Sequence, residues 1–149
     1  ILNRRGRIQK AYYGDEKNRI YAVTDQISLT QEDIREVQMA KGAIAAGIEL
    51  MMEELEITYE QVDRVILCGA FGTYMNAKSA ARIGLIPEPL LSKVIAGGNA
   101  AGMGCRQITM DQKLFALTGE LVQKIEPLDL ASLPQFQRTF AKQMAFSEV

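Results

Sequence analysis

The sequence twice runs a short apolar stretch directly into glycines, first at "VILCGAFGTYMN" (65–76) and again at "VIAGGNAAGMGC" (94–105). An apolar run of this length that ends in glycine and precedes helix-forming residues is typical of a strand that enters a helix. Two such units close together in the chain favour parallel strands joined by a helix. The sequence therefore predicts an α/β fold.

The residues around this pair predict further elements in one domain that covers residues 1–149. Downstream of a first helix we expect strands at 64–68 and 93–96, and helices at 77–83, directly after the second glycines, at 110–125 and at 133–144. Upstream, the aromatic and β-branched segments 9–13 and 19–24 flank the turn-forming "GDEKN" and predict a hairpin. "RRGR" (4–7) predicts a turn between two short strands.

A long helix is expected to begin after Thr30, which forms a weak capping box with Asp33. Its apolar residues step by three and four along one face: Ile34, Val37, Ile44, Ile48, Met51 and Leu55. Lys41 fills one place in this row. Gly42 and Gly47 each cost a helix about 1 kcal/mol relative to alanine, so we expect a neighbour that packs too closely for a side chain.

Composition and charge exclude several classes of protein. With 149 residues, 48% hydrophobic and 23% charged, the chain reads as one globular domain. Its 17 basic and 18 acidic residues give a net charge of −1, which indicates neither a nucleic-acid partner nor a membrane partner. The local cluster Arg4, Arg5, Arg7 and Lys10 is interpreted as a solvated turn rather than a phosphate site.

Histidine is absent, which excludes imidazole catalysis within this chain. Cys68 and Cys105 lack the spacing of a zinc or iron-sulfur site, and we expect both to be buried, reduced thiols of a cytoplasmic protein. We assign no catalytic residue and no metal ligand. The chain begins at Ile1 without a signal-peptide pattern, so we expect a fragment of a longer protein.

The glycine turns have two physical interpretations. Backbone amides and a helix N-terminus at the carboxyl edge of a parallel sheet can bind a phosphorylated ligand, and glycine lets that ligand approach the main chain. Alternatively, the glycines only reverse the chain, since neither turn is a GxGxxG or GKS/GKT motif. Lys41 is either a ligand residue or a lysine whose stem packs while its ammonium group reaches water.

Four segments together resemble a known family: "DIREVQMAKGAIAAGIELMM", "VILCGAFGTYMNAKSAARIGLIPE", "IAGGNAAGMG" and "LPQFQRTFAKQMAF". They are similar to the C-terminal domain of ATP-dependent reductive activators of corrinoid proteins. Those proteins belong to the superfamily of acetate and sugar kinases, heat-shock chaperones and actin (ASKHA). The resemblance implies a ribonuclease-H-like, actin-like ATPase lobe with a mixed sheet and flanking helices.

The resemblance also implies a set of nucleotide-binding residues. The first turn matches the adenosine motif of the superfamily and would place beside the base and ribose Gly69, Ala70, Phe71 and Gly72. The second turn matches the connecting motif at the interlobe hinge, with Gly97, Gly98, Asn99, Ala100, Ala101 and Gly102. Gln38 and Lys41 match positions from which relatives reach the ribose and base. Asn99 could equally cap the following helix.

By the same resemblance, the parent protein would use ATP or ADP with Mg²⁺ to return an inactive Co(II) corrinoid protein to Co(I) for methyl transfer in anaerobic metabolism. Electrons would come through a 2Fe-2S cluster in a parent domain outside this chain, and the parent would form a homodimer. Because the first lobe and its phosphate-contacting strands are missing here, we expect the isolated chain to be catalytically silent.

Two alternatives stay open. The chain could be a noncatalytic module whose glycines only pack and whose outer faces mediate dimerisation or docking on a corrinoid protein. It could also be the ATPase lobe of another ASKHA activator, such as an activator of acyl-CoA dehydratases. Those relatives hold a shared cluster with cysteines at the dimer interface, a role for which a buried Cys68 would be unsuited.

Overall fold

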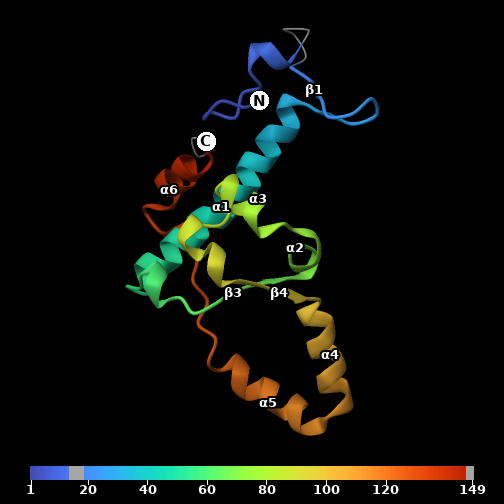
Figure 1. Cartoon of the computed structure of the whole chain (residues 1–149). Coiled ribbons are helices and arrows are strands. Elements are labelled where there is room, and N and C mark those ends of the chain that lie inside the picture. The colour runs from blue at the N-terminus through green and yellow to red at the C-terminus, as the bar shows by residue number, and fades with distance from the viewer. Residues whose placement is uncertain (14–18, 147–149) are drawn as a thin grey trace.

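Helix α1 (Gln31–Glu54) runs through the middle of the molecule, and the other elements lie around it (Figure 1). In this computed structural model, residues 1–13 and 19–146 are described. The remaining elements are η1 (Lys10–Tyr12), β1 (Tyr21–Ala22), β2 (Ser28–Leu29), η2 (Tyr59–Gln61), β3 (Val65–Cys68), α2 (Gly69–Tyr74), α3 (Ala77–Arg82), η3 (Glu88–Lys93), β4 (Val94–Gly98), α4 (Ala100–Met110), α5 (Gln112–Val122), η4 (Leu130–Ser132) and α6 (Phe136–Gln143). Helix α6 packs along α1, whereas α4 and α5 extend away from the end of β4.

The N-terminus of α1 is closed by the predicted capping box. The Thr30 hydroxyl accepts a hydrogen bond from the Asp33 backbone N–H at 3.1 Å, and the Asp33 carboxylate accepts one from the Thr30 N–H at 2.8 Å. Hydrogen bonds from the Thr30 backbone and hydroxyl lower the pKa of Asp33. This local signal was sufficient to predict where the helix begins.

The buried face of α1 differs from the predicted apolar row. Val37, Met51 and Leu55 are exposed, the last by 66%. The buried positions are instead Ile34, Lys41, Gly42, Ala45, Ala46, Gly47 and Leu50. Four of these seven are glycine or alanine, because the neighbouring segments approach parts of the helix too closely for large side chains.

Close packing explains both glycines within α1. A Cβ atom on Gly42 would lie 2.9 Å from Met144 Cγ, and one on Gly47 would lie 3.3 Å from Leu130 Cδ1. The predicted close neighbours are therefore the end of α6 and η4. Within α6, the rings of Phe136 and Phe140 stack with centroids 5.9 Å apart.

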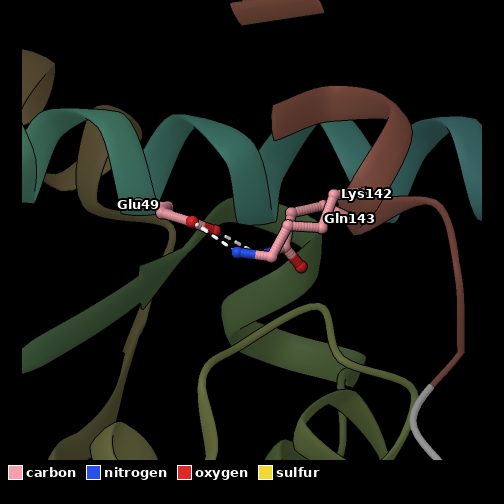
Figure 2. Close-up of polar contacts among 3 residues, drawn as sticks. All are labelled: Glu49, Lys142 and Gln143. Carbon is pink, nitrogen blue, oxygen red and sulfur yellow. Dashed lines mark hydrogen bonds and ion pairs between the residues drawn. The ribbon is translucent and has the colours of Figure 1, made fainter. Parts of the chain in front are cut away.

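A polar contact also joins α1 to α6 (Figure 2). Lys142 Nζ lies 2.8 Å from Glu49 Oε1, and the Gln143 side-chain amide donates to Glu49 Oε2. Partial burial of Glu49 opposes its ionisation, but the hydrogen bonds from Lys142 and Gln143 and the positive charge of Lys142 outweigh it, so the pKa of the carboxyl group is lowered. Glu49 therefore contributes to the docking of α6 as an anion.

The predicted β-α-β unit is confirmed. Strands β3 and β4 pair in parallel, with Val65 opposite Val94 and Ile66 opposite Ile95. The crossover contains α3, whose first turn is capped where Asn76 Oδ1 accepts from the Ser79 N–H at 2.9 Å. One face of the strand pair packs on a small core of Ala80, Ile86 and Leu90.

The opposite face of the strand pair is uncovered in this chain. Ile66 is 58% exposed, Ile95 is 44% exposed, and Cys68 lies in the same exposed row. The expectation that Cys68 and Cys105 are buried is therefore wrong, since both thiols are exposed. Side chains alternate between the two faces of β3, and Cys68 lies on the face away from the core. The prediction was wrong because it treated the apolar run as a strand buried on both faces.

The N-terminal region confirms the predicted turn at 4–7 and corrects the predicted strand at 9–13. Leu2 and Ile8 form an antiparallel bridge around "RRGR", where Gly6 adopts a φ of +70°. The predicted strand at 9–13 is wrong, because Lys10–Tyr12 is a 3-10 helix. Strand β1 pairs instead with β2, which follows it in the chain. The turn between them is held where Thr24 Oγ1 accepts a hydrogen bond from the Ile27 N–H at 3.0 Å. The predicted turn at 14–18 lies outside the described residues.

No helix among the described residues is both long and apolar enough to cross a bilayer.

Replacing Glu49 by glutamine is expected to lower the free energy of unfolding by about 1 kcal/mol at pH 7, because a charged acceptor for Lys142 and Gln143 is lost. Folding lowers the pKa of Glu49 from 4.5, so its stabilisation is present above about pH 4.5 and is lost as the pH falls through the lower folded-state value. Urea denaturation of wild type and Glu49→Gln should show the two stabilities converging in acid. Glu120→Gln on α5 is the control, and a difference that persists in acid would contradict this account.

Candidate functional site

The two glycine turns lie side by side at one edge of the β3–β4 pair. Because the strands are parallel, both carboxyl ends meet at this edge, where α2 begins at Gly69 and α4 begins at Ala100. The first turn continues into α2 rather than forming a loop. A Cβ atom on Gly72 would overlap the Leu67 carbonyl oxygen and lie 3.2 Å from the Gly98 nitrogen. The structure therefore brings the predicted residues 69–72 and 97–99 together.

The glycines of these turns have different physical roles. Gly72 and Gly97 permit close packing, since a Cβ atom on Gly97 would lie 2.7 Å from Cys68 Sγ. Gly69 and Gly98 have φ angles of +69° and +56°, and no described atom lies within 4 Å of where their Cβ atoms would be. The positive φ angles agree with the interpretation that these glycines reverse the chain. Gly69 and Gly98 also border open space, and their role in binding a ligand stays a prediction.

Side chains at the same edge are exposed. The Phe71 ring is 54% exposed, and Ala70 is also exposed. Asn99 caps α4, because its Oδ1 accepts from the Gly102 N–H at 3.0 Å. This edge therefore offers an aromatic face and main-chain groups. Among the described residues, no group of three or more cysteines or acidic residues could hold a metal ion.

Gln38 and Lys41 bind the C-terminal segment (143–146). Lys41 is only 1% exposed, and its Nζ donates to the carbonyl oxygens of Gln143 and Ala145 at 2.6 Å each. Gln38 Nε2 donates to the Met144 carbonyl at 2.9 Å. The alternative in which the Lys41 ammonium reaches water is therefore wrong.

Two features of its surroundings partly offset the cost of burying the Lys41 ammonium group. The carbonyl groups at the end of α6 carry partial negative charge and have no partner inside the helix. The Phe146 ring adds a cation-π contact at 5.4 Å from Nζ to the ring centroid. Burial lowers the pKa of Lys41. For Lys41 to contact a nucleotide, the C-terminal segment would have to leave, so its ligand role stays a prediction.

Comparisons with known proteins identify the family. A family model described as the C-terminal domain of RACo, the ASKHA domain, matches residues 2–149. The chain belongs to this family. The resemblance drawn from the sequence is thereby confirmed, and so is the ASKHA fold class.

Individual relatives agree with this assignment. The chain is 30% identical over 122 residues to the corrinoid activation enzyme RamQ of Eubacterium limosum, covering 82% of this chain and 21% of that protein. It is 26% identical over 122 residues to a [Co(II) methylated amine-specific corrinoid protein] reductase of Methanosarcina barkeri, covering 80% and 22%. A solved reductive activator for corrinoid, iron-sulfur protein superposes with a TM-score of 0.84 at 28% identity, covering 98% of this chain and 25% of that one. The chain thus spans about a fifth to a quarter of these relatives.

Replacing Gly72 by alanine is expected to destabilise the chain by about 1–3 kcal/mol, because the added Cβ overlaps the Leu67 carbonyl. Gly104→Ala in α4 is the matched control, since a Cβ there meets open space and alanine favours a helix by about 1 kcal/mol. Urea denaturation gives both values. Equal stability of Gly72→Ala and Gly104→Ala would contradict the close contact between the turns.

Replacing Lys41 by methionine keeps much of the side-chain volume but removes the donor for Gln143 and Ala145. We expect a loss of about 1–3 kcal/mol in the free energy of unfolding, since the carbonyls stay buried without a partner. Amide hydrogen exchange at Met144 and Ala145 should accelerate, whereas the exposed Lys124→Met should leave it unchanged. Unaltered exchange in Lys41→Met would show that this contact does not hold the C-terminal segment.

Proposed function

We propose that this chain is the C-terminal nucleotide-binding lobe of an ATP-dependent reductive activator that returns a Co(II) corrinoid protein to Co(I) for methyl transfer. The observation that carries the proposal is the family match over residues 2–149, supported by relatives named as a corrinoid activation enzyme and a corrinoid protein reductase. The reaction adds one electron to cobalt. In the proposed parent, a low-potential reductant supplies that electron through a 2Fe-2S cluster in another domain.

The residues at the glycine edge suit an adenosine moiety. Gly69 and Gly98 leave their main chain open to a planar ligand, and the exposed Phe71 ring offers an apolar face. In the proposal, ATP with Mg²⁺ supplies the free energy of hydrolysis for the uphill reduction. This chain contributes binding and orientation of the nucleoside, while the phosphate-contacting and hydrolytic groups belong to the parent's other lobe.

The uncovered face of the β3–β4 pair supports assignment as one lobe of a larger protein. Parallel strands are normally covered on both faces, yet Ile66 and Ile95 are exposed here. Helices α4 and α5 also expose apolar side chains, including Met103, Met110, Leu114, Phe115, Leu117, Leu121 and Val122. We propose that other parts of the parent, its homodimer partner and the corrinoid protein cover these surfaces in the cytoplasm.

A noncatalytic docking module is the second candidate, and one observation favours it. Gln38 and Lys41, which the family resemblance assigns to the ribose and base, bind the C-terminal segment instead. Hydrogen exchange with and without ADP discriminates the two functions. Protection at 69–72 by ADP supports the nucleotide-binding lobe, and its absence supports the docking module.

The decisive experiment follows phosphate release and the electron paramagnetic resonance signal of Co(II) together, using the parent protein, a corrinoid protein, ATP and a reductant. We expect the Co(II) signal to disappear only when ATP and reductant are both present. The isolated chain should release no phosphate above a protein-free blank. A Co(II) signal that persists with every corrinoid protein tried would contradict the activator function, and phosphate release by the isolated chain would contradict its assignment as an incomplete lobe.

A further inference from the structure

A polar pocket lies beside the N-terminal half of α1, where the turn at residues 4–7 meets the helix. It has a volume of about 420 Å³ and is lined by Arg5, Arg7, Arg19, Arg35, Gln31 and Gln38. We call it the arginine pocket. Its guanidinium groups come from three parts of the chain: the N-terminal turn, the segment before β1, and α1. None of the lining residues belongs to the glycine turns, and the pocket shares one residue, Gln38, with the positions that the family resemblance assigns to the ribose and base.

Two glutamines of α1 hold the N-terminal turn in place. Gln31 donates to the Gly6 carbonyl at 2.6 Å and accepts from the Ile8 N–H at 3.0 Å. Gln38 donates to the Arg5 carbonyl at 3.4 Å, and a Cβ atom on Gly6 would overlap its amide. These contacts fix the backbone that carries Arg5 and Arg7. The main chain of this part of the pocket is therefore in place before any ligand arrives.

The charged residues that line this pocket, among those that the structure describes, are all arginines. Within the same described residues, no ion pair joins Arg5, Arg7 or Arg35 to a carboxylate. The acidic side chains of Glu32 and Glu36 line a neighbouring cavity that shares Arg19 and Arg35 with the arginine pocket. Guanidinium groups that converge on one small volume repel each other, and a bound oxyanion converts that repulsion into attraction.

The chemistry of the lining selects the ligand. Each guanidinium presents a planar fork of N–H donors that matches the oxygens of a phosphate group, and the glutamine side chains add further polar groups. We propose that the arginine pocket binds a phosphorylated small molecule through a multiply charged phosphate group, such as a diphosphate. This inference does not depend on nucleotide binding at the glycine turns.

The sequence alone concealed this pocket. It showed the basic cluster at residues 4–10, which reads as a solvated turn because nothing nearby in the chain completes a site. Arg19 and Arg35 lie on other segments and join Arg5 and Arg7 only in the folded chain. The polar Gln31 and Gln38 on a helix face that meets a basic turn are the one local signal.

The test is isothermal titration calorimetry of the complete 149-residue chain with pyrophosphate at low ionic strength, where charge screening is weak. The exposed pair Arg7 and Arg35 is replaced together by glutamine, and the matched control is the exposed Arg106→Gln in α4. We expect pyrophosphate to bind the wild type and Arg106→Gln equally. The double variant should bind at least about tenfold more weakly, since it lacks two charge-assisted contacts.

Further titrations distinguish the source of the phosphate. ADP bound through the pocket loses affinity in the double variant as pyrophosphate does, whereas adenosine, which lacks phosphate, should be unaffected by these substitutions. A nucleoside site at the glycine turns can therefore fail without affecting the pyrophosphate result, and the reverse also holds.

A measurement on the wild type protects the test against misfolded variants. In nuclear magnetic resonance spectra, pyrophosphate should shift the side-chain Nε–Hε signals of Arg5, Arg7 and Arg35 but leave that of Arg106 in place. The proposal is overturned if the wild type shows neither heat nor these shifts, or if Arg106→Gln weakens binding as much as the double variant does.

Discussion

The buried ammonium group of Lys41 sets the geometry on which much of this structure depends. An unpaired charge inside a protein costs several kcal/mol, so Lys41 is stable there only with acceptors placed around it. The last residue of α6, Gln143, supplies one acceptor, because its carbonyl group has no helical partner, and Ala145 just beyond the helix supplies another. That requirement draws α6 across α1 at one position. Gly42 and Glu49, which both follow Lys41 in α1, then contact residues of the same segment.

The glycine edge shows how one sequence pattern combines two requirements. A parallel strand pair needs close contact between the turns that leave it, and Gly72 and Gly97 satisfy that need by omitting a side chain. A ligand needs open main chain, which Gly69 and Gly98 leave beside them. The number of glycines in the sequence does not show which of them serve close packing and which leave the main chain open. The folded backbone shows that Gly72 and Gly97 are needed for close packing, whereas the ligand role of Gly69 and Gly98 stays a prediction.

Local signals in the sequence predicted the local structure well. The Thr30 capping box, the β3–α3–β4 unit and the Asn99 cap each depend on a few adjacent residues. The family resemblance supplied the fold class. The carbonyl partners of Lys41 could not be predicted because they lie far along the chain. The exposure of Cys68 depends on which face of β3 is covered, and the pairing of β1 with β2 depends on which of two nearby turns forms the hairpin. The prediction that the apolar row of α1 is its buried face was wrong, because small residues are buried where another helix approaches closely.

The contacts of Gln38 and Lys41 have a consequence for how the C-terminal segment can change. Both side chains donate hydrogen bonds to main-chain carbonyl oxygens, which every amino acid carries. These hydrogen bonds therefore depend on the path of the main chain and not on the identity of its residues. Substitutions among residues 143–146 leave those acceptors in place. An insertion or deletion would shift them out of register with fixed donors. These three hydrogen bonds therefore constrain the length of the segment, while the side-chain contacts of Gln143 and Phe146 constrain its composition.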